Sequence, residues 1–302
     1  MRLGVVFAST GGPKILRAIR SFRKMEPDLP VHVVFDIDSN TWKDKGYKAL
    51  TVLEEGFSEK FVGIKVFCLQ GNKAHINGTL NQGMKWLREL GYSHVGLFHD
   101  DLIFSPLLEN QFYISKCIQR MEHSSELMAS SGIGFGDLET LYRNPGTVRF
   151  QPGHWDAPPE VWDSMDLESE ELWQKLCPQG IPARISEFFM FFVDYTEPGS
   201  LVGHCCRLGP VGQIVPLWAW EAVGGFDETY GVHYDSDYPA ACLVKQLPPV
   251  LCFPNSPILH LHNQSIGYKD PSVNLWGDVT AAFQKKYNKE YGQFWREQEF
   301  YK

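Results

Sequence analysis

Two adjacent carboxylates, Asp100 and Asp101, follow an apolar run that ends in His99. The run over residues 96–98 is predicted to be a buried strand, so the carboxylates stand at its carboxyl end, where open α/β sheets bind ligands. Neighbouring carboxylates repel each other, and burial makes that repulsion costly unless a cation lies beside them. A cation between carboxylates and a phosphate offsets both charges. The segment therefore predicts a metal–phosphate site.

Three further segments carry acidic or histidine side chains beside predicted strands: Asp36 with Asp38, residues 221–237, and His260 with His262. The second of these contains two glycines, Gly224 and Gly225, and ends in Asp235 and Asp237. If the third is a strand, His260 and His262 share one face. Carboxylates can accept protons from a reacting hydroxyl, and imidazoles can bind a metal. The four segments are therefore the candidates for chemistry.

The first part of the chain alternates strand and helix patterns. Apolar runs predict strands at Leu3–Ala8, Val31–Phe35, Lys65–Leu69 and Val95–Phe98, and helical spacing predicts helices over Lys14–Lys24 and Gly78–Leu90. This alternation indicates right-handed βαβ units. We expect an α/β fold with a Rossmann-like, mixed but mainly parallel sheet flanked by helices.

After about residue 130 the pattern becomes irregular. Glycine and proline recur throughout, for example at 132–136 and 178–182, which predicts long loops or a small lobe with one short helix over 168–176. Order returns with predicted strands at Gly212–Leu217, Val250–Phe253 and Ile258–Leu261 and a closing helix over Val273–Tyr287. We expect one domain over 1–302, made of three parts: 1–130, 131–211 and 212–302.

The composition excludes several classes of protein. A chain of 302 residues that is 43% hydrophobic can bury a large core, and a net charge of -8 argues against nucleic acid as the main partner. No apolar run approaches the length of a membrane span, and the chain enters a predicted strand directly after Met1-Arg2, leaving no room for a signal peptide. Seven cysteines without a Cys-x-x-Cys pair indicate reduced thiols. We expect a cytoplasmic protein.

The turn after the first strand, Ser9-Thr10-Gly11-Gly12-Pro13, matches neither Gly-x-Gly-x-x-Gly nor the P-loop pattern. A nicotinamide-dependent dehydrogenase and a P-loop NTPase are therefore disfavoured. The turn is predicted to be a tight β–α connection whose backbone, at Thr10, can line a ligand.

The order and spacing of these motifs resemble the GT-A glycosyltransferases, most closely those of family 2. Phe98-His99-Asp100-Asp101 takes the place of the Asp-x-Asp motif, and residues 223–228 with Asp235-Ser236-Asp237 resemble the Gly-Gly-Phe-Asp-Glu segment and the acidic pair after it. Asp36-Ile37-Asp38-Ser39 resembles the acidic turn that meets the nucleobase and ribose. Gly71-Asn72, followed by Asn81 and Gly83, resembles the asparagine-bearing stretch before the metal motif. The resemblance covers most of residues 1–130 and 212–265.

The resemblance implies a GT-A fold and a metal-dependent, inverting transfer of a sugar from a nucleotide-sugar donor to an acceptor hydroxyl. The expected cofactor is a divalent metal, Mn2+ or Mg2+, and the expected donor is a UDP- or GDP-sugar. The acceptor is expected to be a glycan, a glycoprotein or a small molecule. Residues 1–130 become the nucleotide-sugar-binding half, 131–211 an acceptor-side insertion, and 212–302 the acceptor and catalytic half with the C-terminal helix.

Asp101 stands at the last aspartate of the Asp-x-Asp motif, so the resemblance assigns it the metal. His99 replaces the first aspartate, and it either contacts the nucleotide, binds a softer metal such as Mn2+, or packs. His260 or His262 completes the metal shell, or both satisfy backbone groups.

Asp235 is expected to act as the general base that takes the acceptor's proton, with Asp237 as the second candidate. The alternative for Asp237 is helix capping. The predicted donor-binding residues are Thr10, Asp36, Asp38, Asn72, Asn81, Asp100, Trp220, Gly224 and Gly225. For Trp220 the alternative is a place in the core, and for the glycine pair it is a plain turn.

Two other functions stay open. A nucleotidyltransferase that makes a nucleotide sugar would share the sheet and a metal aspartate, but its glycine-rich N-terminal signature has only a faint echo in residues 9–14. A catalytically silent nucleotide- or carbohydrate-binding protein on the same fold is favoured by His99 in place of an aspartate. The retained Asp101, Asp235 and Asp237 oppose it.

Overall fold

The structure is a computed structural model, and it describes residues 2–9, 14–36, 63–67, 75–104, 128–130, 133–134, 166, 169–171, 193–194, 203–205, 213–230, 234–247, 250–252, 257–260 and 275–297. Some of these, including Asp36, Asp235 and His260, are described by their backbone alone.

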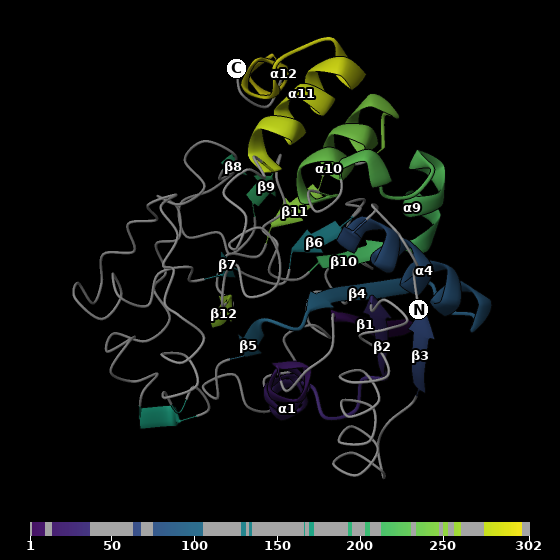
Figure 1. The fold of residues 1–302 in the computed structure, drawn as a ribbon, viewed down its shortest axis with the longest axis vertical. Helices are drawn as coiled ribbons and strands as arrows, with labels where there is room; N and C mark the ends of the chain where they lie inside the picture. The colour runs from purple at the N-terminus through teal and green to yellow at the C-terminus, as the bar shows by residue number, and fades with distance from the viewer. Residues whose placement is uncertain are drawn as a thin grey trace.

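The centre of the fold is a nine-stranded mixed sheet (Figure 1). Its strands are β1 (Leu3–Ser9), β2 (Val31–Asp36), β3 (Gly63–Phe67), β4 (His94–His99), β6 (Met128–Ser130), β8 (Val193–Asp194), β9 (Gly203–Cys205), β10 (Gln213–Pro216) and β11 (Val250–Cys252). The spatial order is β3-β2-β1-β4-β10-β6-β11-β9-β8. The first four strands run parallel, while β10 is antiparallel to both β4 and β6. This sheet confirms the predicted fold class.

A second, three-stranded sheet lies beside the first. It consists of β5 (Leu102–Phe104), β12 (Pro257–His260) and β7 (Ile133–Gly134), in the order β5-β12-β7. Strand β12 runs antiparallel to β5, with His260 opposite Leu102. The small sheet therefore joins the segment after the acidic motif to a segment near the end of the chain.

Helices cover both faces of the large sheet. They are α1 (Lys14–Met25), α4 (His75–Glu89), α9 (Leu217–Val223), α10 (Tyr234–Val244), α11 (Leu275–Tyr287) and α12 (Tyr291–Arg296), with a 3-10 turn, η3, at Glu228–Tyr230. In Figure 1, α1 lies below the sheet, α4 and α9 lie above it, and α11 and α12 lie beyond α10. Within the described parts of the chain, no helix is both long and apolar enough to cross a membrane.

Alternating side chains on β1 build two separate cores, because successive residues of a strand point to opposite faces. Phe7 points toward α1 and packs with Phe22, Phe98 and Phe104. The ring centroids of the contacting pairs lie 5.2–5.6 Å apart. All four rings are buried. This aromatic cluster fixes α1 beneath the carboxyl half of the sheet.

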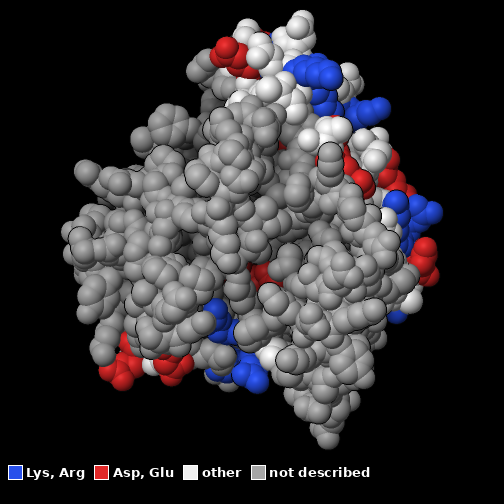
Figure 2. Space-filling view, in the orientation of Figure 1, with Lys and Arg blue, Asp and Glu red and all other residues white. Residues whose placement is uncertain are grey.

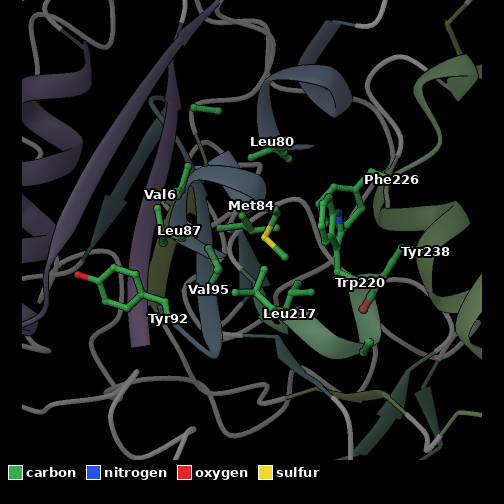
Figure 3. Close-up of a cluster of buried hydrophobic side chains, with 14 of the residues drawn as sticks. Val6, Leu80, Met84, Leu87, Tyr92, Val95, Leu217, Trp220, Phe226 and Tyr238 are labelled. Atoms are coloured by element: carbon green, nitrogen blue, oxygen red, sulfur yellow. The ribbon is translucent and has the colours of Figure 1, made fainter. Parts of the chain in front are cut away.

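The opposite core holds the other helices to the sheet (Figure 3). Val6 from β1 packs there with Met84 and Leu87 from α4, and the cluster continues to Trp220, Phe226 and Tyr238. Strand β1 therefore contributes side chains to both cores.

The predicted elements agree with the structure except at their ends. Helix α4 begins at His75, three residues before the predicted Gly78, and β3 begins at Gly63, two residues before the predicted Lys65; residues 68 and 69 of the predicted strand lie outside the described residues. Of the predicted helix over 168–176 only residues 169–171 are described. Most of the predicted insertion, 131–211, lies outside the described residues, so the three-part division of the chain stays a prediction.

Candidate functional site

Strand pairing brings three of the predicted segments to one edge of the sheet. In the parallel ladders, Ser9 of β1 pairs with Phe35 of β2, and Ala8 pairs with His99 of β4. Ser9, Asp36 and His99 are the last residues of their strands. The carboxyl ends of parallel strands are where such sheets bind ligands. The backbone position of Asp36 agrees with this edge, whereas Thr10, Asp38 and Asn72 lie outside the described residues.

The two carboxylates after β4 are both buried, with Asp100 6% and Asp101 7% exposed. The Ser9 hydroxyl donates a hydrogen bond of 2.6 Å to Oδ2 of Asp100. This is the short distance expected when the acceptor is ionised. The bond ties the acidic turn to the end of β1, and it leaves two adjacent carboxyl groups with little water to solvate them.

His260 is brought to the same turn by the small sheet. Leu102 directly follows Asp101 and pairs with His260 across the β5–β12 ladder. His99 is partly exposed at the end of β4. His262 lies outside the described residues. Two of the four predicted metal-binding residues, His99 and Asp101, thus flank Asp100 in this turn, and the backbone of His260 lies opposite Leu102, the residue after Asp101.

The donor set at this edge fits a hard divalent cation. In the described part of the chain, no three acidic, histidine or cysteine side chains are grouped closely enough to hold a metal by themselves. Mg2+ usually keeps several waters and is held by one or two carboxylates together with the phosphates of the substrate. The buried carboxylates of Asp100 and Asp101 are ligands of this kind, and the metal they would hold stays a prediction.

The two predicted glycines end helix α9. Gly224 and Gly225 have positive φ angles of 87° and 90°. The Gly224 N–H donates to the Glu221 carbonyl at 3.0 Å and the Gly225 N–H to the Trp220 carbonyl at 2.8 Å. This is a glycine cap, in which left-handed residues satisfy the last carbonyls of a helix. The helix cap therefore accounts for glycine at both positions. Their contact with the nucleotide-sugar donor stays a prediction.

Asn81 of α4 holds that turn in place. Its Nδ2 donates to the Phe226 carbonyl at 2.9 Å and to Oε1 of Glu228 at 3.0 Å. Its Oδ1 accepts from the Phe226 N–H at 2.9 Å and from Nε1 of Trp220 at 3.1 Å. The primary amide has two donor hydrogens and two acceptor lone pairs, so these four bonds use its capacity. Asn81 has a structural role, and its contact with the nucleotide-sugar donor stays a prediction.

Trp220 itself is buried, 5% exposed, and belongs to the core in which Figure 3 shows it beside Phe226 and Tyr238. The core is the alternative that the sequence left open for this residue. Trp218, two residues earlier on α9, is 51% exposed. A stacking role for Trp220 stays a prediction.

A chain of polar contacts leads from the sheet edge to helix α10. Helix α4 connects β3 to the parallel strand β4, so its first turn lies at the carboxyl edge of the sheet. In that turn the amide of Asn77 donates to the Asp227 carbonyl at 2.8 Å. Oδ1 of Asp227 accepts from the Thr229 N–H at 3.0 Å and from its hydroxyl at 2.6 Å, which starts η3.

The contacts continue through Lys286 of α11. Its Nζ lies 2.9 Å from Oδ2 of Asp227 and 3.0 and 2.9 Å from the two oxygens of Asp237. The Tyr287 hydroxyl donates to Oδ1 of Asp237 at 2.8 Å. The side chain of Asp237 is 3% exposed, while those of Lys286 and Asp227 are 35% and 27% exposed. Asp237 is thus a buried carboxylate held by a lysine and a tyrosine.

Burial raises the pKa of Asp237, although Lys286 and Tyr287 favour its ionised form. Burial also acts to lower the pKa of Lys286, but Asp237 and Asp227 outweigh it, and the net pKa of the lysine is raised. Lys286 therefore stays charged, and its charge is what makes an ionised Asp237 tolerable at this depth.

Asp235 lies in the first turn of α10, two residues before Asp237. Pro239 follows in the same helix and has no N–H. The Asp235 carbonyl therefore lacks the hydrogen bond that residue 239 would give it in a regular helix. The first turn of α10 is held by fewer helical bonds than usual.

Ser9, Lys286 and Tyr287 are not among the residues predicted from the sequence. A lysine in the last turn of a helix is ordinarily explained by the helix dipole, and the partner of Lys286 is 49 residues earlier. No local pattern reveals such a pair. Ser9 could have been found, because it is the first residue of the turn over 9–13 whose backbone was predicted to line a ligand.

The comparisons agree with the fold. No family model and no curated protein matches the sequence. Among solved structures, the chain is similar to the mannosyltransferase PcManGT from Pyrobaculum calidifontis in complex with GDP-Man and Mn2+, with a TM-score of 0.53 and 12% identity over 95% of this chain. The chain spans 64% of the length of that protein. At this identity the match concerns the fold alone, a mainly parallel α/β sheet of the GT-A-like kind.

Two more distant matches have TM-scores below one half. UDP-glucose pyrophosphorylase from Acinetobacter baumanii has a TM-score of 0.45 and 10% identity, covering 94% of each chain. GalNAc-T7 with UDP, GalNAc and Mn2+ has a TM-score of 0.49 and 9% identity, over 86% of this chain and 44% of that one. Neither discriminates between transfer of a sugar and synthesis of a nucleotide sugar.

Proposed function

We propose that this protein is a metal-dependent, inverting glycosyltransferase of the GT-A type, similar to family 2. It transfers a sugar from a nucleotide-sugar donor to an acceptor hydroxyl. The observation that carries the proposal is the meeting of distant segments at one sheet edge. The end of β1, the buried pair Asp100 and Asp101, and the backbone of His260 all adjoin there.

The buried carboxylates support a metal–diphosphate site. Two adjacent carboxyl groups in a poorly solvated turn favour a cation beside them, and a cation there would draw in the diphosphate of a donor. When bound, Mn2+ or Mg2+ neutralises the charge that grows on the departing diphosphate. Asp101 is the proposed ligand, with His99, His260 and His262 as the candidates to complete its shell. Asp36 and Asp38 would meet the nucleoside.

Asp235 is the proposed general base. The acceptor oxygen attacks the anomeric carbon as the bond from that carbon to the diphosphate breaks. The leaving electron pair departs with the nucleoside diphosphate, and the acceptor proton passes to the Asp235 carboxylate. A single displacement of this kind inverts the anomeric configuration. The contacts from Asn77 through Asp227 and Lys286 to Asp237 link the turn carrying Asp235 with the sheet edge.

The test is a transfer assay with Mn2+ over a panel of UDP- and GDP-sugars, GDP-mannose included because the similar mannosyltransferase binds it. The acceptors are simple sugars, glycans and glycoproteins, and water serves as the acceptor in a hydrolysis arm. We expect release of a nucleoside diphosphate from at least one donor. Replacement D235N should lower kcat by about a thousandfold or more, the upper part of the range for a general base.

The control for that variant is Asp28→Asn, which removes an exposed carboxylate from a loop after α1. Full turnover by D235N would contradict the role of Asp235. A parallel arm mixes nucleoside triphosphate with sugar phosphate. Pyrophosphate release there, without any transfer, would favour a nucleotidyltransferase instead. Donor binding without turnover in either arm would favour a silent binding protein.

A further inference from the structure

Four side chains from three separate elements meet around the first turn of α10. Lys286 and Tyr287 end α11, Asp227 belongs to the turn after α9, and Asp237 lies on α10 itself. Lys286 contacts both oxygens of Asp237, so it fixes the direction of that carboxylate as well as its charge. The cluster is a tertiary clamp on one helical turn.

That helical turn needs an external clamp. Pro239 removes the helical hydrogen bond to the Asp235 carbonyl, and a proline ring inside a helix also crowds the preceding turn. The side chains after Asp237 anchor the rest of the helix, because Tyr238, Ala240 and Cys242 are buried. The body of α10 is thus packed in place, while its first turn depends on contacts made by Asp237.

We infer that Lys286 is a positioning residue: by clamping Asp237 against Asp227 it sets the first turn of α10, and with it Asp235, relative to the sheet edge. Tyr287 supports the same turn, since its hydroxyl reaches Oδ1 of Asp237 at 2.8 Å. The catalytic part of this inference rests on the proposed function, in which Asp235 is the general base. The clamp itself does not depend on that function.

The proposed role of Lys286 differs from that of residues that bind the nucleotide-sugar donor. Lys286 contacts Asp237 on α10 and Asp227 in the turn after α9, whereas the Ser9–Asp100 hydrogen bond lies at the carboxyl edge of the sheet. The loss of Lys286 should therefore slow the chemical step without weakening donor binding. Displacing a reacting group by about 1 Å can lower a rate about a hundredfold.

The experiment compares K286M with K286R and with K285M, in which the exposed neighbouring lysine is changed. All variants are assayed below the lowest apparent Tm. We expect K286M to lower kcat about 10- to 100-fold with the donor KM changed less than about twofold, K286R to restore most of kcat, and K285M to match wild type. A folded K286M with wild-type kcat would overturn the inference, as would equal losses in K286M and K285M.

Hydrogen exchange gives a readout that needs no activity. In K286M the amides of residues 238, 240 and 241, which lie one turn after residues 234, 236 and 237, should exchange at least about tenfold faster. Those in the middle of α4 should keep their protection, because local opening follows lost tertiary contacts. Unchanged exchange at 238, 240 and 241 would overturn the clamp. Faster exchange in a protein whose wild type transfers no sugar would uphold the clamp and reject the proposed function, so the two failures are distinguishable.

Discussion

Asn81 is a buried side chain whose hydrogen bonds hold the turn that follows α9. Its amide receives or gives four hydrogen bonds, all to the turn over 220–228. The resemblance assigned it to donor binding because of its position in the sequence. The hydrogen bonds show that Asn81 holds the glycine turn on α4, and its contact with the nucleotide sugar stays a prediction.

His32 is a second buried polar residue, and it affects stability rather than chemistry. Its ring is fully buried on β2, with Nδ1 3.3 Å from the Val5 carbonyl and its edges against Trp86 and Tyr92. A carbonyl can only accept, so Nδ1 carries the hydrogen. Burial lowers the pKa of His32 from 6.5 to about 4.

This shift predicts acid sensitivity. Between pH 6.5 and about 4 the unfolded chain binds a proton at His32 and the folded protein does not, so stability falls as the pH falls through that window. The loss at the acid end is at most about 3 kcal/mol. Chemical denaturation of wild type and His32→Phe across that range should show a shallower pH dependence in the variant. Parallel pH profiles would contradict the prediction.

Helix α4 lies close to strands β1 and β2 at Gly83. A Cβ atom at Gly83 would lie 2.9 Å from Cγ1 of Val6 and 3.3 Å from Cγ2 of Val34. Both valines are β-branched, buried and fixed on strands, so they cannot easily move aside. The absence of a side chain at Gly83 is what allows α4 to present Asn77 and Asn81 to the turn.

Replacing Gly83 with alanine therefore sets two effects against each other. Alanine favours a helix by about 1 kcal/mol over glycine, while overpacking a core costs about 1–3 kcal/mol. We expect G83A to be destabilising by about 1 kcal/mol in urea denaturation. In the background of V6A, which removes the nearest methyl groups, the same change should become neutral or stabilising. A stabilising G83A in the wild-type background would show that the approach of α4 is not limited at this position.

Much of the fold could be predicted from the sequence because the central strands and helices are locally encoded. Apolar runs such as 3–8 and 95–98 and the helical spacing over 14–24 lie within a residue or two of the observed elements. The ends were less certain, since the first turn of α4 contains histidine, asparagine and glycine, which are weak helix formers. Its stability comes from contacts such as that of Asn77 with Asp227.

The candidate site was only partly predictable for the same physical reason. The acidic motif after β4 could be found because its position relative to a strand implies the sheet edge. The clamp of Lys286 on Asp237 could not, because it joins elements 49 residues apart through side chains that look ordinary in isolation. The hydrogen bonds of Asn81 and the burial of Trp220 depend on residues far away in the sequence, so these structural roles could not be predicted from local patterns.

For the whole molecule, the net charge and the described surface charges bear on how the proposed anionic donor would bind. Within the described part of the surface in Figure 2, acidic and basic side chains are interspersed around the C-terminal helices and α9, and basic side chains gather near α1. The net charge of -8 repels anions, so binding of an anion without a cation is disfavoured. A diphosphate should therefore bind with its own cation.

The metal–diphosphate site at Asp101 is tested by the thermal shift that GDP and UDP give with and without Mn2+, in wild type, D101N and the control D28N. Saturation at about one hundred times Kd adds about 2.7 kcal/mol of apparent stability. We predict that at least one nucleotide raises Tm only when Mn2+ is present, in wild type and D28N alike, and that D101N loses the shift relative to its own Tm. The same shift without metal, or an undiminished shift in D101N, would contradict a metal–diphosphate site at Asp101.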